Sequence, residues 1–199
     1  MKRLKQLPFV SAFLVLANVI IYIICLLTGG EFYNQGILDL VDVLYRKEYG
    51  RVLSALFFHA DIGHLFNNML ILFFLGAMLE REIGHIALAV LYFLSGTGGN
   101  LLSLWMKVQN MDMAGSLGAS GAIFGLDGVL LALVFFGNRN METVTLKRVL
   151  IMIALSLYSG FTGGNIDNAA HVGGLITGFL AGSVWGALQK RKEFIKNEH

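Results

Sequence analysis

Gly118-Ala119-Ser120-Gly121-Ala122-Ile123-Phe124-Gly125 opens an apolar run that continues to Phe136, and the rest of the chain is organised around this stretch. A hydroxyl framed by small residues at the start of a hydrophobic helix is not required by burial. Taken alone, a serine in such a helix most often bonds back to its own backbone. The glycine frame nevertheless makes Ser120 a candidate nucleophile, which would need a base and hydrogen-bond donors beside it.

The composition indicates a membrane protein. Hydrophobic residues make up 56% of the 199 residues and charged residues only 14%, too few to solvate a globular surface of this size. The net charge of +2 is too small to imply a nucleic-acid partner, and the one cysteine, Cys25, allows no intramolecular disulfide. We expect an all-α polytopic membrane protein with one domain over residues 1–199.

Hydropathy predicts six transmembrane helices within a core at about 9–189. The first apolar run is long enough to span a bilayer, so we expect a retained helix there rather than a cleaved signal peptide. Residues 29–60 mix aromatic and charged side chains and are predicted to lie as an outer loop in the membrane interface. The six spans are expected at 9–27, 61–79, 85–106, 118–136, 148–162 and 168–189.

The distribution of basic residues predicts that both termini are cytoplasmic. With that orientation, eleven of the fifteen Lys and Arg residues lie on the cytoplasmic side and four on the outer side. Cytoplasmic loops carry such an excess of positive charge. We therefore expect a multi-pass protein of the cell (plasma or inner) membrane, with short cytoplasmic tails.

Polar side chains inside the predicted spans define the candidate site, because burying them in a bilayer is costly. The spans at 61–79, 118–136 and 168–189 all run from outside to inside, and each begins with such residues. One depth near the outer face is therefore expected to hold His59, His64, Asn68, Ser120 and His171. Asn67 is expected to form a hydrogen bond at a contact between helices. Asp167 is expected to cap the last span rather than to act as a third catalytic residue.

Glycines predict which spans are in contact. Gly121 and Gly125 form a small-residue face, and the last span carries glycines every four residues from Gly174 to Gly186. Such faces let helix backbones approach closely. Packing them together would bring His171 near Ser120, where an imidazole can take the hydroxyl proton. The glycines at 96–99 follow no strand and are expected to serve packing.

An oxyanion site is also predicted. The span at 118–136 begins outside, so its free N–H groups and the positive end of its dipole lie at Ser120. His64 and Asn68 are four residues apart, hence on one helical face, and both can donate hydrogen bonds.

These segments resemble the rhomboid intramembrane serine proteases over about residues 9–189. The resemblance is carried, in this order and spacing, by residues 59–68 (His-Ala-Asp-Ile-Gly-His-Leu-Phe-Asn-Asn), the stretch at 118–125, and residues 170–178 (Ala-His-Val-Gly-Gly-Leu-Ile-Thr-Gly). It implies that Ser120 is the nucleophile and His171 the base of a dyad without a carboxylate. It also implies that His64, Asn68 and the Ser120 N–H form the oxyanion hole.

The resemblance assigns supporting roles as well. Gly118 would let the backbone approach, His59 would brace the start of the second span, and Phe124 would stack on the histidine ring. Gly174 and Gly178 would form the contact between the fourth and sixth spans. The outer loop resembles the membrane-lying loop of the family, with Gly50-Arg51 where a Trp-Arg pair is usual.

The implied reaction is hydrolysis of peptide bonds in or near transmembrane segments, without metal or cofactor. A helical substrate must unwind before attack, so substrates with helix-destabilising segments are expected. The partners are thus membrane proteins and the lipid bilayer, and the sequence does not predict an oligomeric state. The short fifth span and the glycine-rich residues 159–164 are candidates for a lateral gate.

Two alternatives remain open from the sequence. A transporter or metal-binding membrane protein could use His59, His64 and His171 as ligands, since zinc accepts three imidazoles. A rhomboid-like protein that binds substrates without cleaving them would tolerate loss of the Ser120 hydroxyl.

Overall fold

The structure, a computed structural model, describes residues 7–136, 146–147, 150, 154 and 166–197. This part of the chain is built from helices, and its one β-type pairing is an isolated antiparallel bridge between Leu38 and Ser116. The all-α prediction is confirmed. The helices are α1 (Phe9–Leu27), α2 (Glu31–Gly36), α3 (Leu40–Leu44), α4 (Arg51–Ser54), the 3-10 helix η1 (Ala55–Phe57), α5 (Ile62–Ile83), α6 (His85–Asn110), α7 (Ser120–Phe135) and α9 (Asn168–Asn197).

The helices identify a multi-pass membrane protein. By length and composition, α1, α5, α6 and α9 can each cross a membrane, and α7 is a shorter apolar helix of 16 residues. They correspond to five of the six predicted spans. The predicted span at 148–162, and with it the candidate gate at 159–164, lies outside the described residues.

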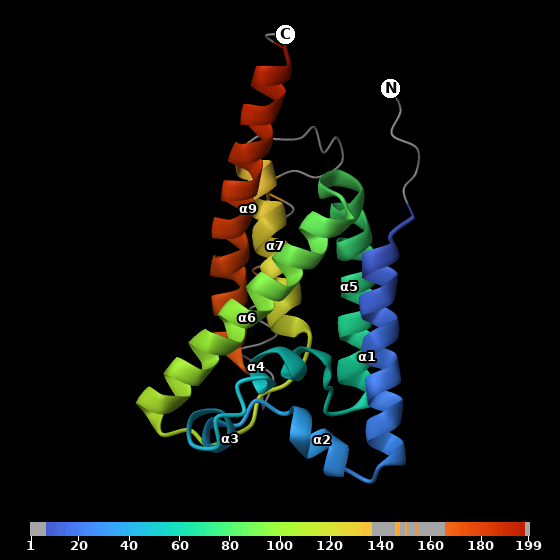
Figure 1. The fold of residues 1–199 in the computed structure, drawn as a ribbon, viewed down its shortest axis with the longest axis vertical. Helices are drawn as coiled ribbons and strands as arrows, with labels where there is room; N and C mark the ends of the chain where they lie inside the picture. The colour runs from blue at the N-terminus through green and yellow to red at the C-terminus, as the bar shows by residue number, and fades with distance from the viewer. Residues whose placement is uncertain (1–6, 137–145, 148–149, 151–153, 155–165, 198–199) are drawn as a thin grey trace.

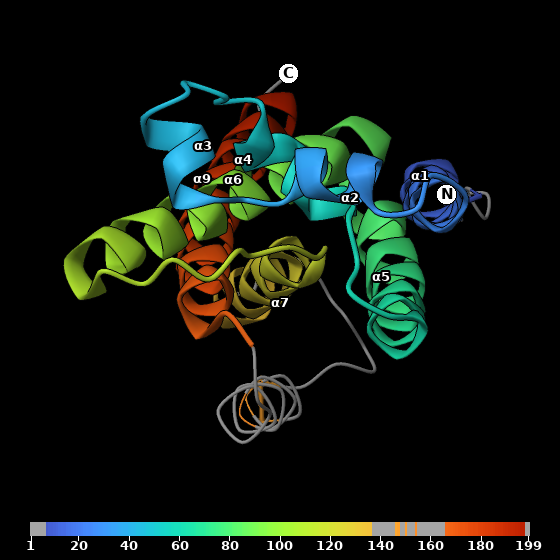
Figure 2. The ribbon, with the colours of Figure 1, turned by 90° about the horizontal axis from the view of Figure 1, so that it is seen from below.

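Three helices begin at the same end of the molecule. In Figure 1, α5, α7 and α9 all start at the end where α2, α3 and α4 lie, whereas α1 and α6 run the opposite way. We call this end, formed by residues 29–60, the loop end; Figure 2 looks onto it. The first turns of α5, α7 and α9 therefore share one level of the bundle, as the polar residues of these spans predicted.

Several helices extend beyond the apolar segments that predicted them. Helix α5 ends at Ile83 rather than 79, and α6 at Asn110 rather than 106. Helix α5 stops at Gly84 (φ +89°), and α6 stops at Met111 in the left-handed conformation. A helix is terminated by such backbone geometry and not by loss of hydropathy, so hydropathy alone ends it too early.

Glycines allow α7 and α9 to pack backbone against backbone. A Cβ atom added at Gly174 would lie 1.9 Å from the carbonyl oxygen of Gly121, and one at Gly178 would lie 1.9 Å from that of Gly125. Any larger residue would push the helices apart. The predicted contact is confirmed, and it fixes the register between the two helices.

Helix α6 packs across this pair in the same way. A Cβ atom at Gly99 would lie 2.5 Å from the carbonyl oxygen of Ala170, so the 96–99 glycines serve packing as expected. Fully buried leucines fill the space between α5, α6 and α7; they include Leu72, Leu79, Leu88, Leu126 and Leu133.

The loop between α1 and α5 is held by one buried arginine. Arg51 donates from Nε to Glu48 (2.6 Å) and from Nη1 to the carbonyl oxygens of Asn34 (2.6 Å) and Ile37 (3.0 Å). Its Nη2 pairs with Asp42 at 2.9 Å. The guanidinium fork thus joins α2, α3 and α4 into one unit. On this unit, Leu38 is fully buried and the rings of Tyr45 and Tyr49 are exposed.

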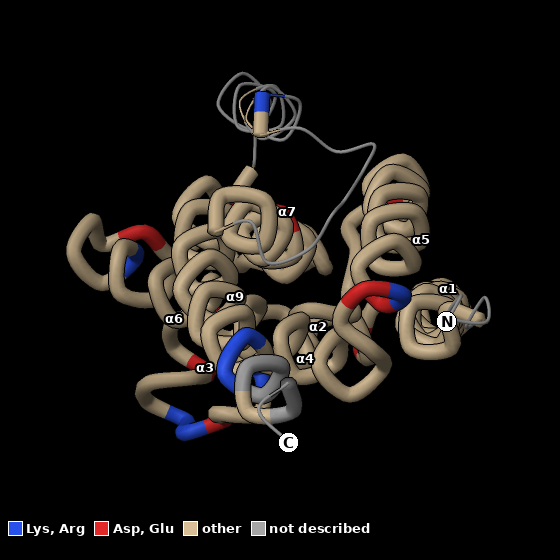
Figure 3. Tube along the Cα trace, turned by 90° about the horizontal axis from the view of Figure 1, so that it is seen from above, with Lys and Arg blue, Asp and Glu red and all other residues tan. Residues whose placement is uncertain are grey.

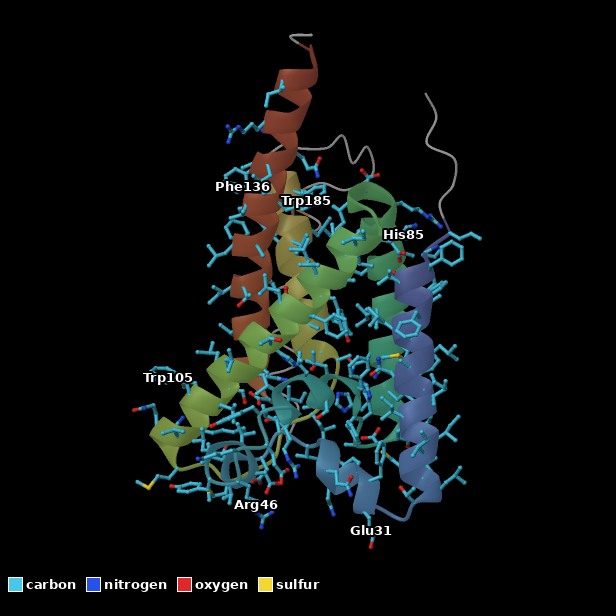
Figure 4. All side chains as sticks on the ribbon, in the orientation of Figure 1. Glu31, Arg46, His85, Trp105, Phe136 and Trp185 are labelled. Atoms are coloured by element: carbon cyan, nitrogen blue, oxygen red, sulfur yellow. The ribbon has the colours of Figure 1, made fainter. Side chains whose placement is uncertain are left out.

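At the opposite end, a buried carboxylate anchors α1. Glu80 of α5 accepts hydrogen bonds from the backbone N–H groups of Val10 (2.8 Å) and Ser11 (2.9 Å) and from the Ser11 hydroxyl (2.6 Å). It also contacts Nδ1 of His85 at 2.5 Å. Figure 4 shows His85 at the end of the bundle remote from Glu31 and Arg46.

Candidate active site

Ser120 and His171 are brought together by the α7–α9 contact. Ser120 is the first residue of α7 and His171 lies in the first turn of α9. Nε2 of His171 and Oγ of Ser120 form a hydrogen bond of 2.8 Å. The histidine is buried, with 7% of its surface exposed, whereas Ser120 is half-buried. This geometry allows the imidazole to accept the serine proton.

Phe124 covers one face of the His171 ring. The ring centroids are 4.3 Å apart and the planes differ by 17°, which is a stacked arrangement. Within the described residues, Nδ1 of His171 has no hydrogen-bond partner. The ring orientation is therefore set by the stack and by the bond to Ser120.

His64 lies against the backbone that precedes Ser120. Gly118 has φ +122°, and a Cβ atom there would lie 2.9 Å from Cε1 and 3.0 Å from Nε2 of His64. The backbone N–H of Gly118 donates to the carbonyl oxygen of Ala55 at 2.8 Å. Only glycine combines this backbone conformation with so close an approach of an imidazole.

Helix α5 presents two donors from one face. The side chain of Asp61 accepts from the backbone N–H of His64 at 2.8 Å and so caps the start of α5. Asn68, one turn further, is buried, and its amide nitrogen has no partner within the described part of the chain. Asn67 is exposed, so the helix contact expected for it is not found among the described residues. An N–H donor on Asn68 is thus free to bind another group.

His59 packs beside His64 just before α5. It is 2% exposed, and the two imidazole rings meet edge to face with centroids 4.9 Å apart. Burial lowers the pKa of His59 to about 4, and the neighbouring His64 acts in the same direction. His59 is therefore neutral at neutral pH and supports the ring of His64 by packing.

Asp167 makes its hydrogen bonds to groups other than the imidazole of His171. Its Oδ1 accepts from the backbone N–H of Ala170 at 2.9 Å, which caps α9 as the sequence predicted. Its Oδ2 accepts from the hydroxyls of Ser103 and Ser116.

A polar cavity of about 630 Å³ opens beside these residues. It extends from His64 along α6 and the segment before α7 to the start of α9. The cavity is large enough for several water molecules. Its polar lining includes Tyr33, His64, Ser103, Lys107, Asn110, Asp112, Ser116 and Asp167.

Some buried polar groups were missed by the sequence reasoning. Asp127 of α7 is 3% exposed, and its Oδ1 lacks a partner in the described residues. A carboxyl inside an apolar span was the available signal. Asn100 donates to the carbonyl oxygen of Val52 at 2.8 Å and joins α6 to α4. Among residues that the structure describes, no three His, Cys, Asp or Glu side chains converge on a potential metal position.

Comparison with known proteins identifies relatives over most of the chain. RHOMBOID-like protein 4 of Arabidopsis thaliana is 40% identical over 153 residues, which cover 76% of this chain and 38% of that protein. Rhomboid protease GluP of Bacillus subtilis (strain 168) is 36% identical over 145 residues, or 72% of this chain and 27% of GluP. RHOMBOID-like protein 6, mitochondrial, of Arabidopsis thaliana is 36% identical, over 75% of this chain and 48% of that protein.

The chain therefore spans less than half the length of each of these three relatives. The family model described as Rhomboid domain matches residues 46–187, a range that includes His59, His64, Asn68, Ser120 and His171. With this match and these identities, the chain belongs to the rhomboid family.

Proposed function

We propose that this protein is an intramembrane serine endopeptidase that hydrolyses peptide bonds in or near the transmembrane segments of membrane proteins. The observation that carries the proposal is the 2.8 Å hydrogen bond between Ser120 Oγ and His171 Nε2 at the level where α7 and α9 begin. Membership of a family that includes a protein named as a rhomboid protease supports it.

In the first step, Nε2 of His171 takes the proton of the Ser120 hydroxyl while Oγ attacks the scissile carbonyl carbon. Before this transfer the neutral ring carries its own proton on Nδ1, and after it the ring is an imidazolium. The carbonyl π electrons move onto oxygen and form a tetrahedral oxyanion. No carboxylate is needed to orient the ring, because the Phe124 stack supplies an alternative constraint.

The oxyanion would be stabilised by the Ser120 N–H at the N-terminus of α7 and by donors on His64 and Asn68. Collapse breaks the C–N bond, and His171 returns its proton to the leaving amine. A water molecule then attacks the acyl ester and gives a proton to His171. When this second tetrahedral intermediate collapses, the bond between the acyl carbon and Oγ breaks, His171 returns the proton to Oγ, and the acid product leaves. The adjoining polar cavity would supply this water.

The expected substrates are membrane proteins whose transmembrane helix unwinds easily. Peptide carbonyls in a helix are hydrogen-bonded and are shielded from Ser120 until the helix opens. Each glycine near the cleaved bond lowers that cost by about 1 kcal/mol relative to alanine, and β-branched or small polar residues lower it by less.

We propose that residues 1–199 form a single rhomboid-like domain in a cell membrane with both termini cytoplasmic. Lys190 and Arg191 lie in the last turns of α9, remote from the loop end, and Figure 3 shows basic residues gathered there. Cytoplasmic basic residues would put the candidate site toward the outer face. One relative bears a mitochondrial name, so a fluorescent fusion and protease protection should be used to test the location.

The direct test is labelling by a fluorophosphonate probe together with cleavage of a transmembrane substrate in liposomes. Wild type should label and cleave, and both activities should vanish in Ser120→Ala and His171→Ala. A chelator should have no effect. Cleavage that persists in Ser120→Ala would rule the proposal out.

The same experiment separates the alternatives. Chelator-sensitive activity would favour a histidine-bound metal. Substrate capture without cleavage, equal in wild type and Ser120→Ala, would indicate a rhomboid-like binding protein.

A further inference from the structure

The carboxylate of Asp167 joins three segments of the chain around the candidate site. Its Oδ1 accepts from the backbone N–H of Ala170 at 2.9 Å in the first turn of α9. Its Oδ2 accepts from the hydroxyl of Ser103 on α6 and from that of Ser116 in the segment before α7. Hydrogen bonds to an ionised acceptor are roughly twice as strong as neutral ones.

The Ser116–Asp167 contact is in register with the Ser120–His171 contact. Ser116 precedes Ser120 by four residues, and Asp167 precedes His171 by four residues. The two residues of each pair are 51 positions apart in the chain. The two contacts are thus successive links between the same two segments.

Ser116 is itself fixed from the other side. Its N–H and carbonyl oxygen pair with the backbone of Leu38 at 3.0 and 2.9 Å, and Gly118 N–H donates to Ala55 at 2.8 Å. Leu38 and Ala55 belong to the loop end and are buried. Through Ser116, the Asp167 carboxylate therefore ties the start of α9 to this rigid framework.

We propose that Asp167 is a positioning residue that holds the start of α9 in place relative to the backbone leading into Ser120. It acts by placing His171 and makes no hydrogen bond to the imidazole, whose Nδ1 has no partner among the described residues. The inference rests on the proposed protease function. Displacing a reacting group by about 1 Å can cost on the order of a hundredfold in rate, so a small shift of α9 would be measurable.

The test compares Asp167→Asn, Ser116→Ala and the double variant in liposomes, with Asp112→Asn as the matched control. The Asp112 carboxylate lines the same cavity but accepts from Ala114 and Lys107, outside α9. For each protein, kcat, KM, the rate of fluorophosphonate labelling and Tm would be measured.

Asp167→Asn should lower kcat and the labelling rate by about tenfold or more while KM stays within about twofold. The double variant should lose no more than Asp167→Asn alone, since both changes break one link. Asp112→Asn should match wild type. Equal rates for Asp167→Asn and Asp112→Asn, or losses that multiply in the double variant, would overturn the inference.

Two further measurements keep the test decisive. If Asp167→Asn does not fold, Ser103→Ala combined with Ser116→Ala retains the cap and should reproduce the kcat loss. If wild type neither labels nor cleaves, the result contradicts the proposed protease function but leaves the positioning role of Asp167 to be tested separately. Amide hydrogen exchange then decides the positioning role, because Asp167→Asn should speed exchange at residues 116–120 by about tenfold and Asp112→Asn should not.

Discussion

Phe124 and His171 stack face to face, with ring centroids 4.3 Å apart and planes within 17° of each other. Phe124 lies four residues after Ser120, so one turn of α7 carries both the hydroxyl and the surface that orients the imidazole. In the proposed mechanism, one helix therefore aligns the proton donor, Ser120, with the proton acceptor, His171.

Replacing Phe124 by leucine should lower kcat by about two- to tenfold, because an aromatic pair contributes roughly 0.5–1.5 kcal/mol beyond its buried area. Phe124→Tyr keeps the ring face and should retain most of the activity. Cleavage assays in liposomes compare the two, with Phe73→Leu on the surface of α5 as the control. Equal kcat for the leucine and tyrosine variants would contradict a role for the stack.

Gly174→Ala should destabilise the bundle by about 1–3 kcal/mol or more, since the new Cβ atom meets a backbone carbonyl that cannot move aside. Gly50→Ala is the control, because nothing lies within 4 Å of a Cβ atom there. Thermal unfolding in detergent measures both. A Tm for Gly174→Ala equal to that of the control would show that α7 and α9 are less closely packed than described.

Arg51→Lys should loosen the loop end. Lysine keeps the charge but cannot reach Glu48, Asp42 and two carbonyl oxygens together, and each buried acceptor left unpaired costs about 1–3 kcal/mol. Limited proteolysis between residues 29 and 60 should become faster. Arg46→Lys changes a side chain that is 67% exposed and should leave the digestion rate unaltered.

The buried His59 should make the folded protein less stable in acid. Its pKa is about 4 in the folded protein and 6.5 as the ordinary value, so the unfolded chain binds the proton first as pH falls. The free energy of unfolding should be unaffected by His59 above pH 6.5 and should decrease from there to about pH 4, by up to about 3 kcal/mol. Tm measured against pH should fall less steeply for His59→Gln than for wild type; parallel curves would refute this.

Much of the fold could be predicted because helices and their contacts leave local patterns in the sequence. Apolar runs placed α1, α5, α6, α7 and α9, and small residues at intervals of four identified the face that α7 and α9 share. The helix ends were less accurate, since Gly84 and Met111 stop α5 and α6 several residues after hydropathy declines.

The contacts of the loop end and of Asp167 could not be predicted in the same way. Arg51 bonds to residues up to 17 positions away, and Asp167 bonds to Ser103 and Ser116, which are 64 and 51 positions away. No periodicity links such residues, and each is an ordinary polar residue in its own segment. Asp127 differs, because a carboxyl within an apolar run is a signal that the sequence itself carries.

The short length of α7 bears on the lipid around the protein. Sixteen residues extend only about 24 Å, whereas the hydrocarbon layer of a typical bilayer is about 30 Å thick. If the C-terminal end of α7 lies at one edge of the hydrocarbon layer, Ser120 at its first residue would lie below the opposite headgroups, or the surrounding bilayer would thin to meet it. Ser120 would then lie at different depths in thin and in thick membranes. The acyl-chain length of the lipid would therefore affect the site with no change in its residues.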